Sequence, residues 1–140
     1  MTAEPRIVRL TIPAKAEYIS LSRLALAGIP RLRDEADETV YDLKLALTEA
    51  CTNSVRHAYE AGSEGTVQIV YELGENDISI EVIDEGEGFV LDEASEADRM
   101  SESGLGIAII RSLADELEIE PGEGRGSRLR FVKHLGAAAA

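Results

Sequence analysis

Apolar residues alternate with polar ones in several short segments of the chain, and this alternation predicts β-strands. The expected strands cover residues 6–12, 66–73, 77–83 and 127–133. The residues Gly74-Glu75-Asn76 predict a hairpin turn between the second and third of these strands. Another short strand is expected near residues 118–120.

Apolar residues at three- and four-residue spacing predict three helices, at residues 16–27, from Asp37 to about Tyr59, and at 105–117. The long helix carries the clearest stripe, formed by Val40, Leu43, Leu47, Ala50, Ser54 and Ala58. Asp37 is suited to cap this helix. Residues 31–37 before it are expected to form a polar connection.

The order of these elements is β-α-α-β-β-loop-α-β, with the short strand expected before the last long one. It predicts an α+β fold, a two-layer α/β sandwich with helices on one face of a mixed, mostly antiparallel sheet. We expect a single domain over residues 1–136 and a frayed tail of four alanines at 137–140. The acidic segment 84–103 is long for a connection, and such loops are usually functional or mobile.

The chain has 140 residues and a net charge of −13. A protein this acidic is a poor candidate for direct nucleic-acid binding, which needs clustered Lys and Arg. The charge serves either solubility alone or the attraction of a basic partner surface. One cysteine (Cys51) and two histidines (His57 and His134) exclude an internal disulfide and a multi-His metal site. No membrane span or secretion signal is recognisable, so the expected location is cytoplasmic.

Three polar residues, Glu49, Asn53 and His57, recur at four-residue spacing and point from one side of the long helix. Their neighbours are apolar or small, and unpaired polar groups are costly to bury. An Asn oxygen suits Mg²⁺, and a carboxylate one turn away can deprotonate a hydroxyl. The alternative is a solvated polar stripe with a hydrogen bond along the helix.

An apolar strand runs directly into Asp84-Glu85-Gly86-Glu87-Gly88. Asp84 can accept a hydrogen bond from an exocyclic amine such as that of adenine. Gly86 and Gly88 would let the backbone approach a flat base closely. The alternative is an acidic turn after a strand, because Asp and Gly are common in turns.

The residues Gly104-Leu105-Gly106 open the last predicted helix, where free backbone N–H groups favour a phosphate. The alternative is a glycine-rich hinge. Gly126-Ser127, at the start of the final strand, is a weak signal alone. The chain has no P-loop, no nucleophile elbow and none of the motifs of eukaryotic-type protein kinases. Ile109 stands where a dinucleotide-binding motif needs its third glycine.

Taken together and in this order, the four elements resemble the Bergerat-fold (GHKL, histidine kinase-like) ATPase superfamily, over nearly the whole chain. Residues 49–59 look like its N box, residues 84–89 like its first glycine box, and residues 104–106 like its second. Ser127 stands where Thr is usual and keeps the hydroxyl. The run Glu-Ala-Cys-Thr-Asn from Glu49, followed by His-Ala-Tyr, is particularly similar to the anti-sigma-factor serine/threonine kinases.

The resemblance implies a role for each matching residue. Glu49 would be the general base, Asn53 would coordinate Mg²⁺, and Asp84 would hold the adenine amine. The remaining matches would shape the adenine pocket (Gly86 and Gly88), present N–H groups to phosphates (Gly104, Leu105 and Gly106) or support the adenine end (Ser127).

For two residues the resemblance leaves two possible roles each. His57 lies at the family's His position and either contacts the nucleotide or makes a structural hydrogen bond. Arg99 lies in the segment 90–103, which the resemblance implies would cover ATP, and either reaches the γ-phosphate or pairs with Glu96 or Glu102 on the surface.

The leading hypothesis is an anti-sigma factor that binds ATP and Mg²⁺ and sequesters a sigma factor. It would also phosphorylate a Ser or Thr of an anti-anti-sigma antagonist protein, and relatives of this kind are homodimers. One alternative is an ATP-dependent binding adaptor without kinase activity. Another is a switch kinase that activates a phosphatase.

Overall fold

The computed structural model describes residues 6–60, 65–84, 103–121 and 127–136. Of residues 57–60, 103, 104 and 121 it describes the backbone alone. Several predictions lie outside the described residues: Gly86 and Gly88 of the first glycine box, the loop at 90–103 that would cover ATP, with Arg99 and all but its last residue, and the alanine tail at 137–140.

Within the described residues, five strands form one sheet, in the order β1-β2-β3-β5-β4. They are β1 (Arg6–Pro13), β2 (Thr66–Leu73), β3 (Asp77–Asp84), β4 (Glu116–Pro121) and β5 (Ser127–His134). Each of the four strand pairs is antiparallel. The sheet is therefore antiparallel throughout the described residues, where the sequence predicted a mixed, mostly antiparallel one.

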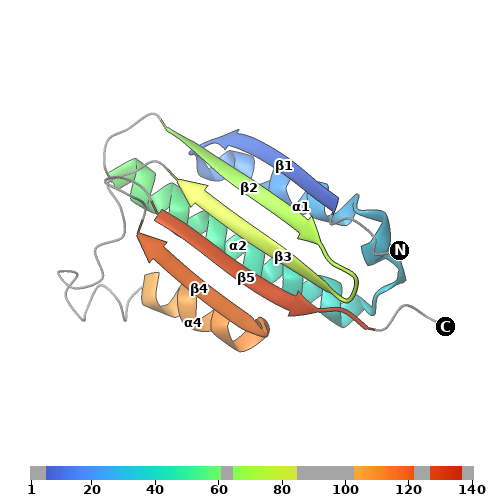
Figure 1. The fold of residues 1–140 in the computed structure, drawn as a ribbon. Coiled ribbons are helices and arrows are strands. Elements are labelled where there is room, and N and C mark those ends of the chain that lie inside the picture. Colours follow the sequence, from blue (N-terminus) through green and yellow to red (C-terminus); the bar gives the residue numbers. More distant parts are fainter. Residues whose placement is uncertain (1–5, 61–64, 85–102, 122–126, 137–140) are drawn as a thin grey trace.

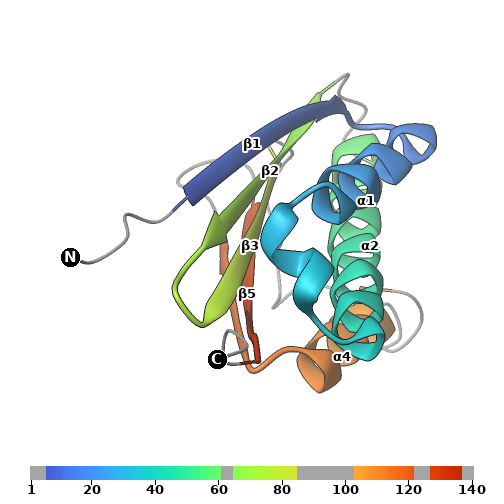
Figure 2. The same ribbon diagram turned by 90° about the vertical axis from the view of Figure 1, so that its right-hand side faces the viewer.

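The helices lie together on one face of this sheet and make the second layer (Figure 1, Figure 2). They are η1 (Ala16–Tyr18), α1 (Ile19–Ala27), η2 (Pro30–Asp34), α2 (Asp37–Glu60) and α4 (Ser103–Leu113), of which η1 and η2 are 3₁₀-helices. The predicted α+β two-layer sandwich is confirmed. Figure 2 shows the long helix α2 running along the sheet between α1 and α4.

Several helix boundaries differ from those predicted. The helix predicted at 16–27 is divided into η1 and α1, and α4 begins at Ser103 rather than at Leu105. The N–H of Val40 bonds to the carbonyl of Ala36, so Asp37 is the first helical residue rather than the cap. The helix α4 ends at Leu113, four residues before the predicted end at Leu117. Leu117 instead pairs with Phe131 in the sheet, because an apolar residue fits the inner face of a strand as well as a helix stripe.

The segment 31–37, expected as a polar connection, contains η2 and a small polar cluster. Arg31 pairs with Glu35 and also donates to the carbonyl of Gly136, at 2.8 Å. Burial would raise the pKa of the Glu35 carboxyl, but the Gly136 N–H and the Arg31 guanidinium lower it below its usual value. This cluster fastens the end of the last strand to the helical layer.

The core lies between α2 and the sheet. From α2 the fully buried stripe includes Leu43, Leu47 and Ala50, and the sheet contributes such residues as Ile80 and Val82. Cys51 is also buried, and burial raises the pKa of its thiol to about 11. The thiol is therefore neutral at physiological pH, which excludes a thiolate nucleophile at this position.

Among the helices of the described residues, none is long and apolar enough to cross a membrane.

Candidate functional site

Four predicted elements meet at one end of the molecule, at the left of Figure 1. They are the second half of α2, the last residue of β3, the first residue of β5 and the start of α4. They are far apart in the sequence, and the antiparallel pairing of β3 with β5 and the packing of α4 on α2 bring them together.

Asp84 and Ser127 are directly opposite each other in the β3–β5 ladder. Both side chains point to the inner face and are buried, with 3% and 6% exposed. The Ser127 hydroxyl donates a hydrogen bond to Oδ2 of Asp84 at 2.6 Å. A buried carboxylate needs such donors to offset its desolvation, so Ser127 fixes the orientation of the Asp84 side chain at the end of the sheet.

Asn53 lies on α2 beside the buried stripe and is 8% exposed. Its side-chain oxygen, Oδ1, is buried and accepts no hydrogen bond from the residues that the structure describes. An unpaired buried acceptor costs about 1–3 kcal/mol, so native proteins retain one where a ligand or ion uses it. An amide oxygen is a hard ligand of the kind that Mg²⁺ prefers.

Glu49 lies one turn before Asn53 and contacts the other helix of the site. A Cβ atom placed on Gly106 would lie 3.1 Å from Oε2 of Glu49. Gly106 and Ile110, four residues apart on α4, are the buried positions among residues 105–113 of that helix and therefore define the face that packs on α2. The Glu49 carboxylate thus touches the first turn of α4.

The first turn of α4 has free backbone N–H groups and the positive end of the helix dipole. The predicted phosphate-binding residues Gly104, Leu105 and Gly106 all lie in this turn. The side chain of Leu105 is 58% exposed, so its backbone is the part suited to a phosphate. Glu49 and the buried oxygen of Asn53 lie one turn apart on α2. Together with the first turn of α4, these residues fit a phosphate chain that carries Mg²⁺.

Comparison with known proteins identifies the family of this chain. The sequence profile of the histidine kinase-like ATPase domain matches residues 12–133. The chain belongs to this family. The resemblance of its sequence to the GHKL superfamily is thereby confirmed.

Relatives in the family include proteins named serine-protein kinase RsbW. The one from Bacillus subtilis is 32% identical over 123 residues, which cover 81% of this chain and 77% of the relative. The one from Listeria monocytogenes is 35% identical over 127 residues, covering 84% and 81%. The one from Bacillus velezensis is 31% identical over 134 residues, covering 89% and 84%.

Solved structures of the family share the fold. A crystal structure of the RsbU and RsbW domains of a Mycobacterium tuberculosis protein superposes with a TM-score of 0.70 at 20% identity. The match covers 96% of this chain and 34% of that chain, so this chain spans about a third of its length. A histidine kinase domain from Erythrobacter litoralis gives a TM-score of 0.59 at 26% identity, covering 89% of this chain and 62% of that chain.

The fold places some of the predicted family residues and leaves others undescribed. It brings Glu49 to Gly106 and Asp84 to Ser127, and it buries Asn53. The backbone of His57 belongs to α2, one turn after Asn53, and its role stays a prediction. The roles of Gly86, Gly88 and Arg99 also stay predictions because these residues lie outside the described ranges.

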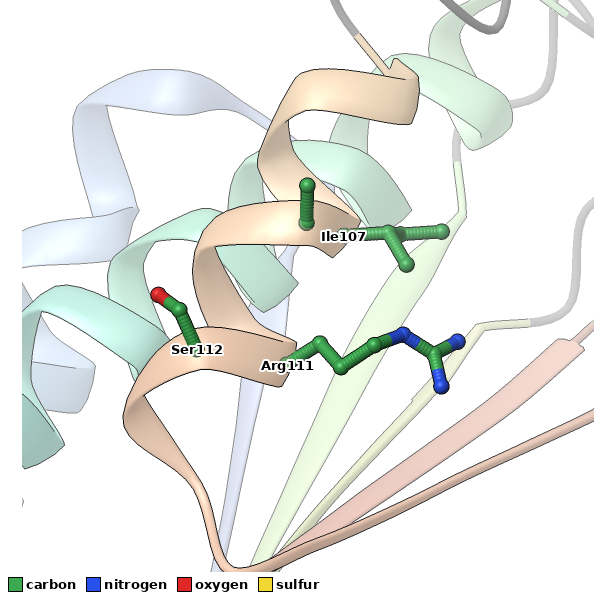
Figure 3. A pocket seen from close by; sticks show the side chains of 4 residues that line it. Ile107, Arg111 and Ser112 are labelled. Carbon is green, nitrogen blue, oxygen red and sulfur yellow. The ribbon is translucent and has the colours of Figure 1, made fainter.

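One surface feature has no counterpart in the sequence analysis. A depression of about 390 Å³ on the outer side of α4 is lined by Ile107, Ala108, Arg111 and Ser112 (Figure 3). These residues lie away from the buried Gly106–Ile110 face, so the depression holds none of the predicted site residues. The sequence predicts these residues as part of a helix, and no motif there indicates a ligand.

Proposed function

We propose that this protein is a serine/threonine-protein kinase that uses ATP with Mg²⁺ and acts as an anti-sigma factor. The observation that carries the proposal is the buried, unpaired Oδ1 of Asn53, one turn from a carboxylate that touches the start of α4. A solvated polar stripe, the alternative drawn from the sequence, does not account for an amide oxygen buried without a partner. A site for a metal-bound phosphate chain does.

The geometry supports a division of the site into two ends. At one end, Asp84, held by Ser127, would accept a hydrogen bond from the adenine amine. At the other, Asn53 would hold Mg²⁺, and the N–H groups in the first turn of α4 would bind phosphate oxygens. When bound, Mg²⁺ neutralises charge on the phosphates.

Glu49 would act as the general base. Its carboxylate would take the proton from a Ser or Thr hydroxyl of the substrate protein as the hydroxyl oxygen bonds to the γ-phosphorus. The bond between that phosphorus and the β–γ bridging oxygen breaks, and ADP leaves. The positive end of the α4 dipole favours the phosphates, which carry negative charge throughout the transfer.

The partners proposed from the family resemblance are a sigma factor, which the protein would sequester, and an anti-anti-sigma antagonist, which it would phosphorylate. Proteins named serine-protein kinase RsbW, at 31–36% identity, support this choice of activity. We further propose a homodimer that acts in the cytoplasm. Phosphorylation would release the antagonist and leave the kinase able to hold the sigma factor.

The test is incubation of the purified protein with γ-³²P-labelled ATP, Mg²⁺ and candidate antagonist proteins from the same genome. We expect label on a Ser or Thr of one antagonist, and no label when EDTA replaces Mg²⁺. Tight ATP binding without transfer to any protein would refute the kinase and favour the adaptor without kinase activity. Transfer to a protein that controls a phosphatase would instead support the switch-kinase alternative.

Base selectivity tests the Asp84 end of the site. In Asp84→Ala we expect ATP affinity to fall about 10- to 150-fold, because a hydrogen bond to a charged group contributes about 1.5–3 kcal/mol. GTP affinity should change little, so discrimination between ATP and GTP is lost. Competition binding with both nucleotides measures the two affinities.

Ser127→Ala is the matched variant, because it keeps the carboxylate and removes the hydroxyl that orients it. We expect a smaller loss of ATP affinity, about 2- to 10-fold, from an effect of about 0.5–1.5 kcal/mol. An Asp84→Ala protein that still prefers ATP over GTP would overturn the assignment of Asp84 to the adenine amine.

A further inference from the structure

Gly106 is buried on the face of α4 that packs against α2. A Cβ atom at this position would lie 3.1 Å from Oε2 of Glu49. That distance is shorter than an ordinary van der Waals contact. The carboxylate of the proposed general base therefore lies beside Gly106, at the space that a side chain would enter.

Backbone conformation does not explain a glycine at this position. Gly106 lies within the helix, and its φ is outside the left-handed region that favours glycine. Glycine weakens a helix relative to alanine because it has more conformational freedom to lose. The remaining reason for glycine here is space, and the atom that uses this space is the Glu49 carboxylate oxygen.

We infer that Gly106 is a positioning residue for Glu49, an inference that rests on the proposed function in naming Glu49 as the base. The missing side chain lets the carboxylate sit against the first turn of α4, where phosphates are proposed to bind. The helix that binds the phosphates thereby also sets the position of the base.

Alanine at position 106 would displace the carboxylate by a few tenths of an ångström. The displaced atom is the far end of a flexible side chain, so the protein should still fold. Proton abstraction depends on hydrogen-bond reach and alignment between base and hydroxyl, so a small displacement of the base slows transfer. The backbone N–H of residue 106 is retained, so nucleotide binding should persist.

The first experiment compares Gly106→Ala with Gly28→Ala. Gly28, at the end of α1, is a matched control, because a Cβ there would meet two carbonyl oxygens at an ordinary 3.5 Å. At saturating ATP and Mg²⁺ we expect Gly106→Ala to slow single-turnover transfer about tenfold. Its ATP affinity should stay within about threefold of wild type, a smaller change than the loss of one hydrogen bond causes. Gly28→Ala should match wild type in both.

The opposite pattern would overturn the inference. If Gly106→Ala weakens ATP binding and the bound complex reacts at the wild-type rate, the glycine serves the close approach of a phosphate instead. Wild-type transfer and affinity together would show that the contact with Glu49 does not position the base.

A second experiment tests the contact without any kinase activity. Urea denaturation of nucleotide-free protein is measured for wild type, Gly106→Ala, Glu49→Ala and the double variant, which form a double-mutant cycle. Gly106→Ala should raise the unfolding midpoint more in the Glu49→Ala protein than in wild type, because no carboxylate then lies close to the new Cβ. Equal shifts in both backgrounds would refute the contact. A wild-type protein that phosphorylates nothing would refute the proposed function while leaving this result interpretable.

Discussion

Replacing Glu49 by Gln is expected to slow phosphoryl transfer by about 10²- to 10⁴-fold, the usual contribution of a general base. Gln has the size and shape of Glu but cannot take up the proton of the attacking hydroxyl. It also fits the space beside Gly106 that the carboxylate fills. ATP affinity should therefore stay near that of wild type, and the loss should appear in the rate of the bound complex.

The measurement is single-turnover transfer of labelled phosphate at saturating ATP, with ATP affinity determined separately. Glu38→Gln is the matched control, because it makes the same chemical change in the first turn of the same helix, on an exposed residue. Full transfer by Glu49→Gln would remove this residue as the base. Slow transfer that rises to the wild-type rate at higher ATP concentration would indicate a role in binding.

Replacing Asn53 by Ala is expected to remove the Mg²⁺-dependent part of ATP binding. We predict that Mg²⁺ strengthens ATP binding by wild type, and that affinities with Mg²⁺ and with EDTA become nearly equal in the variant. The physical reason is that the buried Oδ1 has no partner in the described part of the chain and is of the ligand type that Mg²⁺ selects. Isothermal calorimetry under both conditions measures the difference.

Protein stability provides the control for this variant. Removing an ordinary buried hydrogen-bonded acceptor leaves its donor unpaired, which costs about 1–3 kcal/mol. Among the described residues, Oδ1 of Asn53 has no donor to leave behind, so Asn53→Ala should not destabilise the nucleotide-free protein: relief of the unpaired acceptor, about 1–3 kcal/mol, offsets the packing lost with the side chain. Asn53→Asp, which keeps an oxygen ligand, should retain Mg²⁺-dependent binding. Unchanged Mg²⁺-dependent affinity in Asn53→Ala would refute the metal role.

The fold class was predictable because its elements follow local patterns. Strands β2 and β3 were expected within one residue of their observed bounds, since alternation and a glycine turn both mark them. The long helix was expected because a stripe such as Leu43, Leu47 and Ala50 is incompatible with a strand. The end of α4 was misplaced because Leu117 satisfies either pattern, and its pairing with Phe131 decides between them.

The sequence by itself determined which residues are the candidates for the chemistry of this site, because the family motifs fix residue types at short spacing along single elements. It named Glu49, Asn53, Asp84 and Ser127 without showing that any two of them meet across the fold. Only the tertiary structure decided that Ser127 orients Asp84, that Asn53 Oδ1 is buried without a partner, and that Glu49 rests on Gly106. These are contacts between strands and between helices that are distant in sequence. Strand register and helix packing set such contacts, and no local pattern encodes them.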